Sequence, residues 1–173
     1  MLSIESCPLP DNALLDRYRR EGAFTDCYTT EMSGAVRQPQ FVLAFYTTAV
    51  FKLERLILNW AVSKPSTDVQ AAQLAEGSID AFAAWTVEAR TENQLLMRDT
   101  YGRTRSWLMV VPILQGSSAR TRLYFGSAVV PEKNPKTGRS RPGLVFRALL
   151  GFHKLYSVVL LYSARSSLER RAP

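Results

Sequence analysis

Apolar and polar residues alternate with a period of two over several stretches of the chain, which then ends in one long apolar segment. Such alternation is typical of half-buried β-strands. It predicts five strands, at residues 24–32, 81–91, 94–100, 103–114 and 120–130. Short turn sequences join the last four strands, so we expect a meander of hairpins, which requires an antiparallel sheet.

Capping signals predict two short helices. Asp11 is a suitable N-cap for a helix over residues 11–21. Ser66 or Thr67 can cap another helix, which runs through Glu76 and ends before a glycine. We therefore expect one short helix before the strand at 24–32 and another before the strand at 81–91.

Residues 40–62 form a longer predicted helix that is apolar over most of its circumference. A helix of this kind is largely buried. Its polar side chains share one stripe, made by Thr48, Lys52, Arg55 and Asn59. Either this stripe is the solvated face of the helix, or Lys52 and Arg55 look into a cavity mouth or an anion site.

The last predicted helix covers residues 143–168 and follows an exposed basic loop at 131–142. One side of this helix carries an apolar stripe that suits packing on a sheet. The stripe consists of Val145, Ala148, Leu149, Phe152, Tyr156, Val159 and Leu160. Leu150, Val158 and Leu161 interrupt the polar side, so we expect another part of the chain, a second subunit or lipid to cover it.

Composition favours one soluble domain over residues 1–173, with 46% apolar and 21% charged residues. The first residues lack the pattern of an export signal, so we expect a cytoplasmic protein. Cys7 and Cys27 are the only cysteines and His153 the only histidine. We therefore expect reduced thiols, no metal and no cofactor.

Charge is distributed unevenly along the chain. Residues 1–97 hold 8 lysines and arginines against 12 aspartates and glutamates, whereas residues 98–173 hold 14 against 3. A basic half can meet phosphates or an anionic membrane. No base-reading motif accompanies it, so nucleic acid is not an expected partner.

The predicted order of elements resembles the helix-grip fold of the START, Bet v 1 and polyketide-cyclase-like proteins. The segments FYTTAVFKLERLILNW, AFAAW, GRTRSW, LYFGSAVV and LLGFHKLYS are also similar to those of an uncharacterised bacterial family, over residues 24–165. The resemblance implies an α+β fold. In it, a curved antiparallel sheet wraps around a long C-terminal helix, with one long and one short helix inserted after the first strand. The complete grip of the superfamily has two strands more than the pattern predicts here.

The resemblance also implies a hydrophobic pocket between the sheet and the last helix, where superfamily members hold lipids, polyketides or plant hormones. We therefore expect a small apolar or amphipathic ligand as partner. The predicted lining consists of Trp85, Val87, Met97, Trp107, Tyr124, Phe152 and Tyr156. Tyr124 and Phe125 are strand neighbours, so only one of them can point inward. Plain core packing would use the same residues.

His153, Lys52, Arg55 and Glu88 are the polar candidates for the pocket or its rim. His153 is either an edge residue of the last helix or the general base of a cyclase or dehydratase. Glu88 lies among charges that we expect to form cross-strand ion pairs on a solvated face. If that face is concave instead, Glu88 and Arg105 become ligand-orienting or catalytic candidates.

A third hypothesis is an interaction module. The apolar outer faces of the long helices would then form a homodimer or contact a membrane surface. Charges near the middle of both apolar segments argue against a membrane-spanning helix.

Overall fold

The computed structural model describes residues 4–52, 66–114, 119–130 and 144–171, with the backbone alone between 144 and 153. Among these residues, seven strands form one antiparallel sheet in the order β1-β2-β7-β6-β5-β4-β3. The strands are β1 (Glu5–Ser6), β2 (Phe24–Ser33), β3 (Ala81–Phe82), β4 (Trp85–Arg90), β5 (Gln94–Asp99), β6 (Thr104–Ile113) and β7 (Arg120–Val129). The predicted α+β class and antiparallel meander are confirmed.

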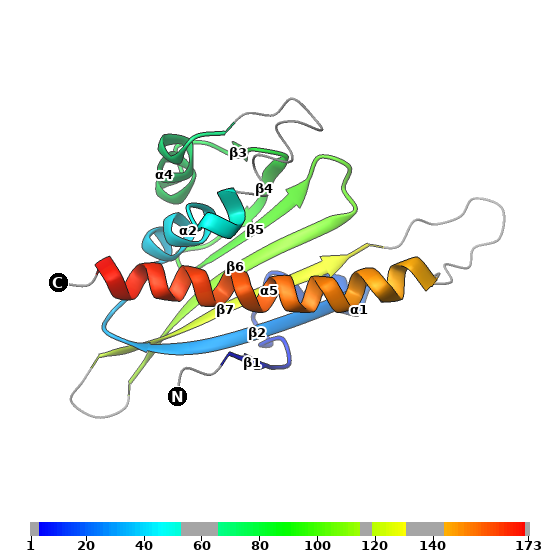
Figure 1. Ribbon diagram of the computed structural model, residues 1–173, viewed down its shortest axis with the longest axis horizontal. Helices are drawn as coiled ribbons and strands as arrows, with labels where there is room; N and C mark the ends of the chain where they lie inside the picture. Colours follow the sequence, from blue (N-terminus) through cyan, green and yellow to red (C-terminus); the bar gives the residue numbers. More distant parts are fainter. Residues whose placement is uncertain (1–3, 53–65, 115–118, 131–143, 172–173) are drawn as a thin grey trace.

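Helices lie on both faces of this sheet (Figure 1). The long C-terminal helix α5 (Leu144–Arg171) crosses one face, with α2 (Gln38–Tyr46) and α4 (Asp68–Glu76) beside it. We call this the helix face. The five-residue helix α1 (Asp16–Arg20) packs on the opposite side, which we call the outer face. A curved antiparallel sheet with the C-terminal helix packed on it is the predicted helix-grip arrangement.

Each face of the sheet has its own hydrophobic core. The core of the helix face is rich in aromatic rings, among them Phe41, Phe45, Tyr46, Phe51, Phe82 and Phe125. On the outer face, Leu15 and Tyr18 pack with Leu96, Trp107 and Met109. Burial of a large apolar side chain stabilises by about 1.5–3 kcal/mol. Packing of this kind holds α1, which is too short to be stable by itself.

The structure adds two short strands to the five predicted. β1 contains only two residues, which is too few for an alternating pattern to be recognised. The predicted strand at 81–91 is divided because Ala83 adopts a left-handed conformation, with φ of 53°. The chain turns there, and Phe82 pairs with Trp85 in a tight hairpin of β3 and β4.

The predicted continuous helix over 40–62 is interrupted. α2 ends at Tyr46, and residues 49–52 begin a new helical segment. Thr48 explains the break, because its hydroxyl accepts a hydrogen bond of 3.1 Å from the backbone N–H of Phe51, as an N-cap does. The remainder of this predicted helix and the predicted loop lie outside the described residues.

The helix predicted over 11–21 forms only as the shorter α1. Gln94 on β5 binds the preceding turn, accepting from the N–H of Leu14 at 2.9 Å and donating to the carbonyl of Asn12 at 3.0 Å. In a longer helix the carbonyl of Asn12 would accept from the N–H of Asp16, which bonds the carbonyl of Ala13 instead. The helix α4 has the predicted cap at Thr67, whose hydroxyl accepts from the third residue of the helix.

A β-bulge at Glu88 changes which side chains of β4 face each way. The pairing register with β5 shifts between Val87 and Ala89. Strict alternation would place these two on one face, but Val87 joins the helix-face core and Ala89 the outer-face core. Arg90 consequently reaches the helix side, where it donates to the carbonyl of Leu74 at 2.7 Å.

Candidate functional site

The described members of the predicted pocket do not share one face of the sheet. Trp107 and Tyr124 belong to the outer-face core, so they cannot line a space beneath α5. Phe125, the strand neighbour of Tyr124, points to the helix face instead. The members that contribute to the helix-face core are Trp85, Val87, Met97 and Tyr156.

Three of the predicted residues fall outside the described side chains, namely Phe152, His153 and Arg55. Lys52 is described, and its Nζ lies 2.5 Å from Oδ2 of Asp68 at the start of α4. Both side chains are about half exposed, so this is a surface ion pair. The enzyme hypothesis, which rests on His153 or a buried acid such as Glu88, stays a prediction.

Aromatic side chains pack closely in the described core of the helix face. The ring of Tyr46 lies 4.8 Å from that of Phe51 and 5.4 Å from that of Phe82, centroid to centroid. Within the described residues, three buried polar atoms there have no hydrogen-bond partner, Gln38 Oε1, Trp85 Nε1 and Ser157 Oγ. Buried polar atoms normally bind protein or water. The predicted pocket between the sheet and α5 stays a prediction.

Glu88 joins the sheet to α1 on the outer face. Its Oε2 lies 2.6 Å from Nε of Arg105, and its Oε1 accepts a bond of 2.6 Å from the hydroxyl of Tyr18 and also binds Arg17. The predicted ion pair with Arg105 is confirmed, but its predicted solvated setting is wrong because α1 covers it. Protein groups therefore occupy both carboxylate oxygens of Glu88.

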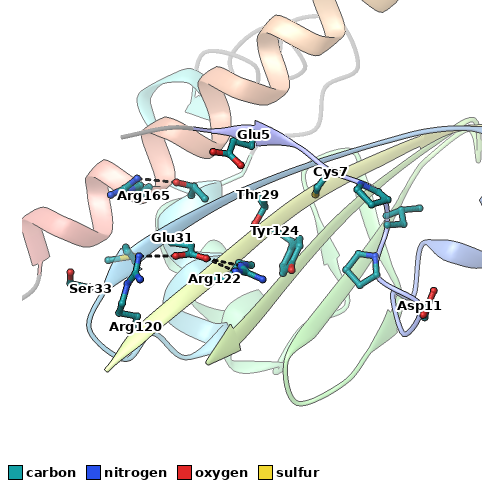
Figure 2. A pocket seen from close by; sticks show the side chains of 15 residues that line it. Glu5, Cys7, Asp11, Thr29, Glu31, Ser33, Arg120, Arg122, Tyr124 and Arg165 are labelled. Carbon is teal, nitrogen blue, oxygen red and sulfur yellow. Dashed lines mark hydrogen bonds and ion pairs between the residues drawn. The ribbon is translucent and has the colours of Figure 1, made fainter. Parts of the chain in front are cut away.

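The half of the outer face that α1 leaves open forms a cleft of about 820 Å³, which we call the arginine cleft (Figure 2). Its floor consists of side chains from β2 and β7 that the strand register places directly opposite one another. These pairs are Thr29 with Tyr124, Glu31 with Arg122, and Ser33 with Arg120.

Two other parts of the chain form the walls of the arginine cleft. Residues 7–11, which include two prolines, border one side, and Arg165 reaches in from α5 on the other. Nη1 of Arg165 donates to the hydroxyl of Thr30 at 2.9 Å, and its Nε donates to Glu169 at 3.0 Å. The cleft thus extends around the edge of β2 toward the C-terminal helix.

One carboxylate holds two arginines at the floor of the cleft. Oε1 of Glu31 accepts from Nε of Arg122 at 2.9 Å, and Oε2 accepts from Arg120 at 2.7 Å. Hydrogen bonding to Arg122, assisted by the charges of both arginines, lowers the pKa of Glu31. A guanidinium has five N–H groups, of which Glu31 occupies only some. Two arginines and one carboxylate give this cluster a net positive charge, although Glu5 and Asp11 also line the cleft.

These arginines were not among the predicted site residues, although the sequence contained a signal for them. The segment RTRLYF places Arg120, Arg122 and Tyr124 at alternate positions of one strand, and hence on one face. The sequence does not show that this half of the face stays uncovered.

The chain itself covers Val158 and Leu161 of α5, which is one of the three predicted alternatives. Leu161 is fully buried and Val158 packs against the core, while the side chain of Leu150 lies outside the described part. Val159 was predicted to face the sheet but is exposed. The exposed apolar stripe of α5 consists of Leu155, Val159 and Tyr162. A homodimer or membrane contact through this helix stays a prediction.

No group of three or more His, Cys, Asp or Glu side chains that could hold a metal ion occurs among the described residues. No helix in the described part of the chain is both long enough and apolar enough to cross a membrane.

No protein-family model matches this chain, and a search of curated proteins finds no match. The structure defines a class, an α+β protein of helix-grip architecture with a polar cleft on the face away from its C-terminal helix.

Proposed function

We propose that the protein binds a small amphipathic molecule with an anionic group, and that it does so in the arginine cleft. The observation that carries this proposal is the convergence of Arg120 and Arg122 on Glu31 at the floor of an open cleft. Guanidinium groups bind carboxylate, sulfonate or phosphate oxygens through paired N–H donors. The cleft volume, about 820 Å³, lies within the range of roughly 300–1,000 Å³ of small-molecule sites.

The surroundings of the arginines support an amphipathic ligand. Leu9, flanked by two prolines, provides an apolar wall, and Met32 also borders the cleft. The ring of Tyr124 packs against that of Trp107, with the ring centroids 6.2 Å apart. Thr29 adds a hydroxyl. A ligand with an apolar body and one anionic end would use both kinds of surface.

Glu31 limits the strength of this binding, because it competes with a ligand anion for the same guanidinium groups. Arg120 and Arg122 are also exposed over 44% and 42% of their side chains, so solvent and salt weaken their charge interactions. We expect a modest affinity that falls as salt is added.

A fluorescence titration with anilinonaphthalene sulfonate tests the proposal, because this probe has an apolar body and one anionic group. Arg122→Ala should weaken its binding by roughly three- to tenfold, the loss of one partly exposed charged hydrogen bond. Arg98→Ala, at an exposed position of β5, is the matched control and should leave the affinity unchanged.

Phenylnaphthylamine, which has the same rings without the sulfonate, separates charge from apolar contact. Its affinity should be the same in the wild type and in Arg122→Ala. Equal losses of sulfonate binding in the Arg122 and Arg98 variants would overturn the proposal, and so would equal losses for the charged and neutral probes.

A further inference from the structure

The only two cysteines of the chain face one another across neighbouring strands. Ser6 at the end of β1 pairs with Tyr28 on β2, so the next residue, Cys7, lies opposite Cys27. The N–H of Cys7 donates to the carbonyl of Cys27 at 3.0 Å, and the two Sγ atoms are 3.2 Å apart. Residues paired in this way have Cα atoms about 5.5 Å apart, within the span of a disulfide.

The two thiols differ in access and in acidity. Cys27 is buried, whereas Cys7 is partly exposed and lines the arginine cleft. Cys7 and Cys27 both line a second cavity, of about 790 Å³, between β2 and α5, whereas only Cys7 of the two also lines the arginine cleft. Hydrogen bonding to Cys27 lowers the pKa of Cys7, with help from Arg122 and against the effects of burial and Glu5. The pKa of Cys27 is raised by Cys7, by burial and by Asp26.

We propose that Cys7 and Cys27 form a reversible dithiol–disulfide site that reacts with small disulfides such as oxidised glutathione. Cys7 is the attacking thiol, since it ionises first and can be reached from both cavities. Cys27, whose sulfur is already in contact with that of Cys7, is the resolving thiol. This inference is independent of anion binding in the cleft.

The exchange has two balanced steps. The Cys7 thiolate attacks one sulfur of oxidised glutathione, so that the glutathione disulfide bond breaks, a mixed disulfide forms on Cys7 and one glutathione thiolate leaves and takes up a proton. Cys27 then loses its proton to solvent and attacks the sulfur of Cys7. The Cys7–Cys27 bond forms and the second glutathione leaves. Two electrons pass from the protein thiols to glutathione.

To test this, the full chain is equilibrated in buffers of reduced and oxidised glutathione and quenched with acid. The remaining thiols are alkylated with iodoacetamide, and the masses of the protein species are determined. The wild type should contain species with two alkyl groups or none, and few with one, because the two thiols oxidise together. The same ratio should be reached from the reduced and from the oxidised protein.

Two variants assign the roles. Cys27→Ser should accumulate one glutathione on Cys7, because the resolving thiol is absent. Cys7→Ser should react with oxidised glutathione at least about tenfold more slowly than Cys27→Ser, because the remaining thiol is buried, which limits access to it and raises its pKa.

The wild-type mass distribution tests the dithiol site without any substitution, so the test holds even if a variant folds poorly. Glutathione bound independently at each thiol, or both thiols fully alkylated at every buffer ratio, would overturn the proposal. A Cys7→Ser protein that reacts as fast as Cys27→Ser would overturn the assignment of Cys7 as the attacking thiol.

Discussion

Two carboxylates on the outer face, Glu88 and Glu31, have different roles because one is covered by a helix and the other is open to solvent. Glu88 lies under α1, where it is 14% exposed and binds the buried Arg105, so it serves the fold. Glu31 carries the same kind of pairing with Arg120 and Arg122, but on an open floor where a ligand has access. The same residue types therefore act as a structural clamp in one place and as a candidate binding site in the other.

Asp16 supplies a prediction about pH. This buried carboxylate accepts from Arg19 at 2.6 Å and Arg20 at 2.5 Å, and these hydrogen bonds lower its pKa. A carboxylate with a lowered folded-state pKa stabilises fully above its unfolded pKa, about 3.9, and the effect is lost as the pH falls through the folded-state value. The stability advantage of the wild type over Asp16→Asn should thus be greatest near neutral pH.

Urea denaturation over a series of pH values measures this advantage directly. The free energies of unfolding of the two proteins should converge as the pH approaches about 2. A difference that persists undiminished in acid would contradict the ion-pair account of α1.

At the scale of elements, the N-terminal segment covers half of the outer face because β7 lets it approach closely at Gly126. A Cβ at this position would lie 2.9 Å from the carbonyl oxygen of Asp26 and 3.0 Å from side-chain atoms of Leu15 and Trp107. Real Cβ atoms essentially never come within 3.0 Å of such groups. Glycine is therefore required where Leu15 packs over the sheet.

Gly126→Ala should destabilise the protein by about 1–3 kcal/mol, the usual cost of overpacking a core. Chemical denaturation measures the loss, and Val69→Ala, at a position of α4 that is 69% exposed, is the control with an expected change within about 0.5 kcal/mol. If Gly126→Ala were as stable as this control, the close approach of Leu15 would not be a constraint.

The elements that the sequence predicts well are those determined by local pattern. The alternation in residues 104–113 and 120–129 and the cap at Thr67 each depend on near neighbours. The features missed depend on distant contacts or on single residues. Gln94 shortens the first helix from another strand, and a bulge at Glu88 reverses the facing of the residues after it.

At the scale of the whole molecule, the two faces of the sheet have different tasks. The helix face carries a core filled by aromatic side chains, and the outer face is only half covered. The acidic first half and the basic second half of the sequence come together at the uncovered part of the outer face. There, arginines from the basic second half of the chain meet Glu5, Asp11 and Glu31 from the acidic first half.

The sequence predicts the helix-grip class because each element is recognised from its own local pattern, and the order of the elements then resembles that fold. It could not locate the cleft, which exists because α1 packs near Arg105, at the other end of the strands, and leaves Arg120 and Arg122 uncovered. Nor could the sequence assign Trp85 to the helix face and Trp107 to the outer face. Alternation shows which residues of a strand share a face, but not which face of the sheet this is.

Sulfonate binding by a Glu31→Gln variant shows whether Arg120 and Arg122 hold the anion, because both guanidinium groups remain in place. Glutamine keeps the shape of the side chain but removes the charge that competes for Arg120 and Arg122. We expect anilinonaphthalene sulfonate to bind this variant roughly three- to tenfold more tightly, while neutral phenylnaphthylamine binds as before. An unchanged or weaker affinity for the sulfonate would show that the two arginines are not what binds an anion in this cleft.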